Sequence, residues 1–123
     1  TGNEDMHLKN FSVIVRGKVV SLSPAYDLLN TTLVLEEARE ESALPLKGKK
    51  SGLTRNDWIA YFCSERLAIP DRQVETILSA FADTLPVWYD LIVRSHLPER
   101  KKEDYKNLLE LRSQRLQISP RNS

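Results

Sequence analysis

The chain has 123 residues, enough for one compact domain but too few for two ordinary ones. Its 41% hydrophobic and 28% charged residues are typical of a soluble globular protein, and its net charge of +1 gives no electrostatic reason to expect nucleic acid or an anionic membrane as a partner. Cys63 is the single cysteine, so no disulfide can form within the chain, and a reducing, cytoplasmic setting is the simpler expectation. We also expect no membrane segment, because no apolar run approaches the roughly 20 residues that span a bilayer.

The first predicted element is a small β-hairpin that follows a polar opening segment. Residues 11–16 and 18–22 form two short apolar runs rich in β-branched side chains, which favour strands. Gly17 separates the two runs and can supply the positive φ that a tight turn needs. Pro24 ends the second run, because proline has no N–H to donate to a ladder. We therefore predict a loop and a hairpin within residues 1–29.

Residues 30–53 show no sustained hydrophobic period, so we expect a variable loop there. An acidic run over residues 36–41 is typical of a solvated surface. The basic run Lys47–Lys50 lies in a glycine-containing turn and is also typical of a solvated loop, although it could meet phosphate or an acidic partner.

The next segment, residues 54–118, is predicted to be helical. Thr54, with Asp57 three residues later, is an acidic variant of the capping box that begins many helices. Pro86 is expected to open or kink a further helix, because proline lacks the N–H that a helix interior uses. The expected fold class is therefore α+β and mainly α, with a small β-hairpin followed by a helical bundle.

Three polar residues around the hairpin are the candidates for chemistry. Phosphoryl transfer by kinases needs a carboxylate that orients and deprotonates the acceptor hydroxyl, together with an amide and a second carboxylate that hold magnesium on the nucleotide. Asp5 and Asn10 are separated by four residues, which is the spacing of kinase catalytic loops. Asp27 follows the hairpin, where the chain must return towards Asn10. The order of loop, hairpin and aspartate predicts a topology as well as a composition.

The opening segment resembles the catalytic-loop signature of the HipA family of serine/threonine kinases, in the run Gly2-Asn3-x-Asp5-x-His7-x-Lys9-Asn10-Phe11-Ser12. These kinases are the toxin components of bacterial toxin–antitoxin pairs. The family's metal-binding segment is similar to residues 23–29, which read Ser23-Pro24-Ala25-Tyr26-Asp27-Leu28-Leu29. A further family segment resembles residues 43–49. The likeness extends over nearly the whole chain, and its first two motifs are the specific ones.

The resemblance implies a protein-kinase-like C-terminal lobe with ATP and Mg²⁺ as cofactors. It implies that Asp5 is the catalytic base, and that Asn10 and Asp27 hold magnesium and, through it, the nucleotide. His7 and Lys9 are further catalytic-loop candidates, and either one could contact the reacting groups or brace the loop. The implied partners are a protein substrate with a hydroxyl acceptor and an antitoxin protein.

Other interpretations remain open. Without the family resemblance, Asp5, Asn10 and Asp27 would be typical turn or cap residues. The chain could also be a non-catalytic helical interaction domain derived from a kinase, or a small-molecule kinase of the aminoglycoside or choline type, which shares the D-x-H-x-x-N pattern. Only four residues precede Asp5, and none of the four glycines forms a phosphate-covering loop. We therefore expect that the N-terminal lobe is absent and that this fragment alone is inactive as a kinase.

Overall fold

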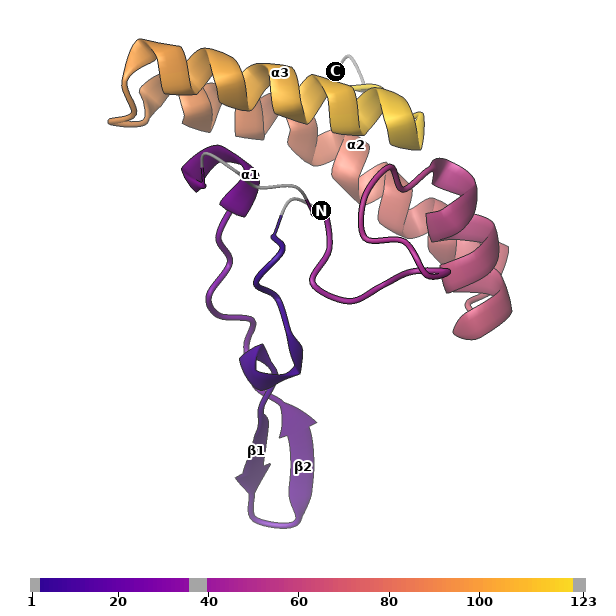
Figure 1. The fold of residues 1–123 in the computed structure, drawn as a ribbon. Helices are drawn as coiled ribbons and strands as arrows, with labels where there is room; N and C mark the ends of the chain where they lie inside the picture. The colour runs from indigo at the N-terminus through magenta and orange to yellow at the C-terminus, as the bar shows by residue number, and fades with distance from the viewer. Residues whose placement is uncertain (1–2, 36–39, 121–123) are drawn as a thin grey trace. The chain divides into compact units, whose positions relative to one another are not determined.

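The computed structural model describes residues 3–35 and 40–120, and contacts divide the chain into two compact units, Thr1–Gly52 and Leu53–Ser123. The first unit carries the short elements and the second carries the long helices (Figure 1). The predicted α+β, mainly α fold class is confirmed. In chain order, the elements are the 3-10 helix η1 (Leu8–Asn10), strands β1 (Val13–Arg16) and β2 (Val19–Leu22), helix α1 (Thr31–Val34), π-helix η2 (Asp57–Arg66), and helices α2 (Asp71–Arg94) and α3 (Glu99–Leu116).

The two strands form the predicted antiparallel hairpin, with Arg16 opposite Val19 across a two-residue turn. Gly17 in this turn has a φ of +62°, a conformation that a side chain would disfavour. Beyond the strands, the Ser23 amide donates to the Ser12 carbonyl at 2.8 Å, so pairing continues up to the residue before the proline. The hairpin therefore brings the chain back beside the loop that precedes it.

The segment predicted as a variable loop contains some regular structure. Helix α1 begins at Thr31, whose side chain is buried. Leu46, also buried, pairs with Lys49 across a tight turn in which Lys47 and Gly48 both have positive φ. Part of the predicted acidic run, residues 36–39, lies outside the described residues. The same holds for Gly2 of the opening motif.

The capping box predicted at the start of the helical region is present. Asp57 Oδ2 accepts hydrogen bonds from the backbone N–H and the hydroxyl of Thr54, at 3.0 and 2.8 Å. The helix that follows has wide π turns instead of α turns: the Leu67 amide donates to the Phe62 carbonyl, five residues earlier. The Ser64 hydroxyl donates to the Ile59 carbonyl over the same interval and supports this wider turn.

The expectation that Pro86 would open or kink a further helix is corrected in one respect, because α2 continues as one helix through this residue. Proline leaves the carbonyl of Ala82 without its usual intrahelical donor. Burial on both sides of the proline offsets this loss, since Ala82, Leu85 and Ile92 all lie in the core. Pro86 itself is exposed.

Helix α2 is long and apolar enough, by length and composition alone, to cross a membrane. Its best 18-residue window has a mean hydropathy of 1.2. The sequence did not show this as an uninterrupted run, because Asp83 and Asp90 lie within the apolar stretch. Core helices of soluble proteins pass the same test, and α2 packs against both α3 and η2 in its own unit. One helix of this kind is weak evidence, so it does not identify the chain as a membrane protein.

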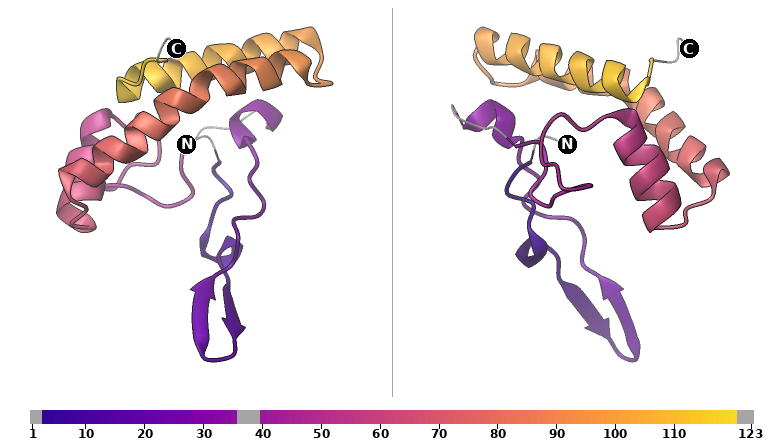
Figure 2. Two further views of the ribbon diagram at one scale, coloured as in Figure 1. Left: turned by 180° about the vertical axis from the view of Figure 1, so that it is seen from behind. Right: turned by 45° about the vertical axis from the view of Figure 1, so that its right-hand side comes forward.

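Helices α2 and α3 lie side by side and run in opposite directions (Figure 2). The α3 helix is followed by its C-cap residue Gln117, which has a left-handed backbone. The Arg55 guanidinium donates to the carbonyl of Leu116, and Arg115 donates to the carbonyl of Leu53 at 3.5 Å. These contacts join the end of α3 to the segment that leads into η2, so the first and last parts of this unit support one another.

Candidate functional site

The loop before the hairpin is a sequence of tight turns closed by local hydrogen bonds. The Asp5 amide donates to Asn3 Oδ1 at 3.0 Å, the His7 amide to the Asp5 carbonyl at 2.8 Å, and the Asn10 amide to the His7 carbonyl at 3.0 Å. Short polar side chains that accept from backbone amides are typical of such turns. The local sequence therefore fixes the positions of Asp5, His7 and Asn10 within a single loop.

The structure brings Asn10 and Asp27 together. The Asn10 amide nitrogen donates to Asp27 Oδ2 and to the carbonyl oxygen of Asp5, at 3.1 Å in both cases. One side chain thus contacts both aspartates that the sequence singles out. The hairpin makes this contact possible, because it returns the chain to the loop after the two strands.

Asp27 has a backbone conformation that is uncommon for a residue with a side chain. Its φ is +55°, in the left-handed region that aspartate and asparagine tolerate better than most residues. The Leu29 amide donates to the Asp27 carbonyl at 3.1 Å and stabilises this turn. Strained residues of this kind cluster at functional sites, where the surrounding contacts hold them.

Two residues that sequence analysis did not assign also hold the site together. Asn3 donates from its amide nitrogen to the Asp27 carbonyl at 3.3 Å, while its amide oxygen accepts from Asp5. The Tyr26 hydroxyl donates to the Lys9 carbonyl at 3.3 Å. Asn3 and Tyr26 both lie within the two motifs, and this position was the one hint in the sequence that they belong to the site. Their residue type and spacing did not indicate which atoms they would contact.

Asp5 and His7 are solvent-accessible. Their side chains are 63% and 47% exposed, and His7 Nε2 lies 3.7 Å from Asp5 Oδ1. This distance is too long for a hydrogen bond, but it suits an ion pair when the imidazole is protonated. The carbonyl of Lys9 accepts from Tyr26, whereas its ammonium group has no hydrogen-bond partner among the described residues. Because its side chain is 63% exposed, the Asp5 carboxylate is accessible to a hydroxyl from outside.

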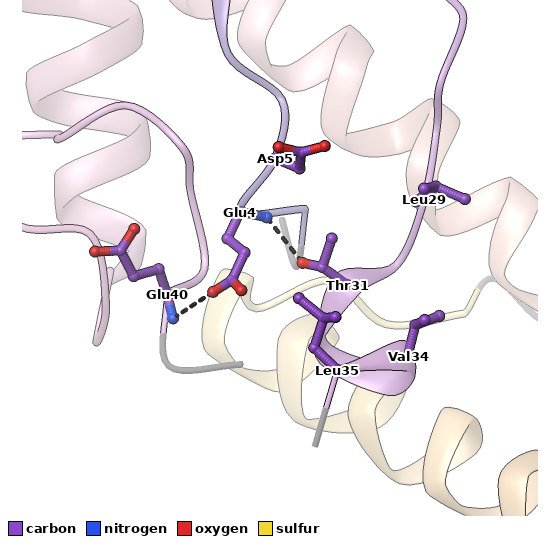
Figure 3. A pocket seen from close by; sticks show the side chains of 7 residues that line it. All are labelled: Glu4, Asp5, Leu29, Thr31, Val34, Leu35 and Glu40. Carbon is purple, nitrogen blue, oxygen red and sulfur yellow. Dashed lines mark hydrogen bonds between the residues drawn. The ribbon is translucent and has the colours of Figure 1, made fainter. Parts of the chain in front are cut away.

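A pocket of about 460 Å³ opens beside Asp5 (Figure 3). Glu4 is fixed at its edge: the Glu4 amide donates to Thr31 Oγ1 at 2.9 Å, and Glu4 Oε2 accepts from the Glu40 amide at 3.1 Å. Sequence analysis did not predict this pocket, because its parts come from separate segments. It is lined by Glu4, Asp5, Leu29, Thr31, Val34, Leu35 and Glu40.

Asn10 and Asp27 have the atoms that a hard cation requires. Carboxylate and amide oxygens are ligands that suit Mg²⁺, which keeps several waters and commonly takes only one or two side chains. Over the described part of the chain, no group of three or more His, Cys, Asp or Glu side chains could hold a metal ion. The pair is therefore suited to an open site completed by water and phosphate, and not to a closed protein cage.

The fold is α+β and mainly α, and its hairpin joins an aspartate-containing loop to a second aspartate. The family model for the HipA-like C-terminal domain matches residues 1–89. The chain therefore belongs to the HipA-like C-terminal domain family. The match covers both specific motifs and ends within α2, so the expected family likeness of α3 lies beyond it. A search of curated proteins found no match to this chain.

Proposed function

We propose that this chain is the portion of a HipA-like serine/threonine protein kinase that carries the catalytic base and the magnesium ligands. The observation that carries the proposal is the Asn10 amide group, which contacts both the Asp5 backbone and the Asp27 carboxylate. A base beside an amide–carboxylate pair is the arrangement that phosphoryl transfer requires. Membership of the HipA-like family supports the same reaction class.

In this proposal, Asp5 orients the hydroxyl of a serine or threonine and accepts its proton. The hydroxyl oxygen forms a bond to the γ-phosphorus of ATP, the bond from that phosphorus to the bridging oxygen breaks, and ADP leaves. Asn10 and Asp27 would hold Mg²⁺, which would supply positive charge to neutralise the phosphates. His7 is close enough to Asp5 to affect its orientation. Lys9 stands next to Asn10 as a candidate for phosphate contact.

The wider biological setting follows from the family and forms part of the proposal. A HipA-like kinase would act in the cytoplasm on a protein substrate and would bind an antitoxin protein. The alternative is a helical interaction domain without catalysis. The specific observation that favours this alternative is the exposed apolar surface of α2, where Ile77, Phe81 and Leu91 are each more than two-fifths exposed.

The test compares two aspartate variants in the complete protein. Asp5→Asn should leave magnesium-dependent ATP binding nearly unchanged and reduce the rate of phosphate transfer about 10²- to 10⁴-fold, as expected for loss of a general base. Asp27→Asn should instead weaken ATP binding in the presence of Mg²⁺. The measurements are nucleotide titrations with and without Mg²⁺ and single-turnover transfer rates.

Asp104→Asn is the matched control, because Asp104 is exposed on α3 in the other unit. It should leave both measurements unchanged. The kinase proposal fails if Asp5→Asn transfers phosphate at the wild-type rate. The assignment of roles fails if Asp5→Asn and Asp27→Asn reduce nucleotide binding equally. If the wild-type protein transfers no phosphate to any serine or threonine, the interaction-domain alternative is favoured.

A further inference from the structure

The pocket beside Asp5 combines two chemically different walls. One wall carries the acidic residues Glu4 and Asp5, with Glu40 at its edge and the Glu40 carboxylate pointing away from Glu4 (Figure 3). The other wall carries the apolar side chains of Leu29, Val34 and Leu35. Its volume of about 460 Å³ is within the range of ligand sites in proteins. A ligand that fits both walls must carry a positive charge at one end and an aliphatic segment beside it.

The acidic wall is only partly neutralised by the protein. Lys50 Nζ lies 2.8 Å from Glu40 Oε2, so this carboxylate already has a cationic partner. Among the residues that the structure describes, Glu4 accepts from the Glu40 backbone N–H and pairs with no cationic side chain, so its negative charge faces the pocket. Over residues 3–35 and 40–120, the one ion-pair partner of Asp5 is His7, at 3.7 Å. A cation entering the pocket would therefore meet the charge of Glu4 and Asp5 together.

The position of Glu4 is built into the fold of this unit. Its backbone amide donates to the hydroxyl of Thr31, which is only 5% exposed. Its carboxylate is turned towards the amide of Glu40. The acidic wall is therefore held by contacts to two separate segments and is not a chance gathering of surface side chains.

The apolar wall suits an aliphatic chain. Leu29, Val34 and Leu35 line it and are 54%, 70% and 49% exposed, so their side chains remain open to contact. Lysine and arginine carry a charged group on a stem of three or four methylene groups, which packs against apolar surface while the charge stays near polar partners. A wholly apolar ligand would leave the carboxylates unpaired, and an anionic ligand would be repelled by them.

We propose that this pocket binds an alkyl cation, an ammonium or guanidinium group on an aliphatic stem, that belongs to the molecule carrying the acceptor hydroxyl. The inference rests on the proposed role of Asp5, because Asp5 lines the pocket and also serves as the base. The pocket then selects acceptors in which a positive charge lies near the hydroxyl. In a protein acceptor, the cation is a lysine or arginine close to the phosphorylated serine or threonine.

The experiment measures binding to the complete protein without ATP or Mg²⁺, so its result does not depend on phosphate transfer. One probe is a labelled glycine-rich peptide with one serine and one arginine two residues away, and its partner carries norleucine in place of arginine. The other probe is 1,5-diaminopentane, which tests whether a free small-molecule cation is the source. Fluorescence anisotropy gives the peptide dissociation constant, and competition gives that of the diamine.

The arginine peptide should bind at least about threefold more tightly than the norleucine peptide, as expected for one partly solvated charge pair. Glu4→Gln keeps an oxygen that can accept from Glu40 and removes the charge, so it should weaken arginine-peptide binding about three- to tenfold. The matched control Glu103→Gln changes an exposed residue of α3 and should have no effect. Added salt should weaken the arginine peptide more than the norleucine peptide.

A second variant changes the apolar wall of the pocket. Val34→Lys supplies an internal ammonium group and should reduce arginine-peptide binding, whereas Val93→Lys, at an exposed position of α2, should not. Equal binding of the arginine and norleucine peptides, together with no Glu4-dependent binding of the diamine, would overturn the alkyl-cation site. If the diamine binds in a Glu4-dependent way and the arginine peptide does not bind, the alkyl-cation site is supported and belongs to a small-molecule acceptor. Failure of transfer from ATP, with these binding results intact, would overturn only the kinase proposal.

Discussion

The amide nitrogen of Asn10 lies 3.1 Å from Oδ2 of Asp27, although the two residues are 17 positions apart and the whole hairpin lies between them. This contact joins an uncharged amide to a carboxylate. It therefore avoids the repulsion that a second carboxylate would cause, and it leaves both side chains available to a cation.

The first prediction is that Asn10→Asp makes the stability of the site depend on magnesium. The change places two carboxylates in contact, which costs about 1 kcal/mol at a solvated site when no cation is present. Without Mg²⁺, the unfolding temperature of Asn10→Asp should then be about 4 °C below that of the wild-type protein. Millimolar Mg²⁺ should restore the wild-type unfolding temperature. Asn10→Ala, as the control, should lower stability without any recovery on addition of Mg²⁺. Equal responses to Mg²⁺ in the two variants would contradict the proposed metal position.

The second prediction concerns Asn3, whose side chain connects the backbones of Asp5 and Asp27. Asn3→Ala removes both hydrogen bonds, each worth about 0.5–1.5 kcal/mol at most in an exposed position. Hydrogen exchange at the Asp5 amide should become faster, and magnesium-dependent ATP binding should weaken because Asp27 is held less firmly. Asn3→Asp keeps the acceptor for the Asp5 amide and should restore slow exchange there, but not the contact with Asp27. Unchanged exchange in Asn3→Ala would show that the loop holds its shape without this side chain.

The third prediction is that Gln117→Gly stabilises the helical unit. Gln117 ends α3 with a φ of +54°, and the Ile118 amide donates to the Ser113 carbonyl at 2.9 Å, as in a Schellman motif. Glycine adopts this conformation without the steric cost, so the free energy of unfolding should rise by about 1 kcal/mol. Gln114→Gly, one turn earlier in the helix, should instead lower it by about 1 kcal/mol. Urea titrations of the three proteins test this, and a loss of stability in Gln117→Gly would refute it.

The fourth prediction is a loss of stability at high pH that depends on Tyr89. Burial raises the pKa of the Tyr89 hydroxyl above its ordinary value of 10.0, and the nearby negative charge of Glu110 raises it further. The folded protein therefore retains the phenolic proton at a pH where the unfolded chain has begun to lose it. The stability linked to this proton is fully present below the ordinary pKa, and it falls as the pH rises through the raised pKa of the folded protein.

Urea titrations at about pH 8.5 and about pH 10.5 bracket the ordinary tyrosine pKa and measure this effect. The wild-type protein should lose more stability between these pH values than Tyr89→Phe, which has no proton to lose. Glu110→Gln should show an intermediate loss, because only the smaller of the two causes is removed. If wild type and Tyr89→Phe lose the same amount, Tyr89 has no role in the alkaline transition.

The features that the sequence predicted well depend on residues close together in the chain. The hairpin required only β-branched runs and Gly17 between them. The capping box required Thr54 and Asp57, three residues apart. Local backbone preferences and short hydrogen bonds decide such structures, so they can be inferred without knowledge of distant contacts.

The course of α2 was decided by packing. A proline such as Pro86 destabilises a helix interior by about 3 kcal/mol relative to alanine. From the sequence, this cost favours a break or a kink. The buried residues Ala82 and Leu85 before it and Ile92 after it lie on the same helix, which continues through the proline. The wide π turns of η2 could not be predicted from sequence either. The spacing of apolar residues does not distinguish a π-helix, with hydrogen bonds over five residues, from an α-helix, with hydrogen bonds over four.

For the candidate site, the sequence alone determined which residues to examine: the motifs singled out Asp5, Asn10 and Asp27, and the order of loop and hairpin predicted that they would meet. Only the tertiary structure decided how they are held and what lies beside them. The hydrogen bond between the Glu4 amide and Thr31 joins residues 27 positions apart, and the one between Glu4 and the Glu40 amide joins residues 36 positions apart. Neither contact leaves a periodic or spacing signal in the sequence, because a hydrogen bond between distant segments depends on how the whole unit folds.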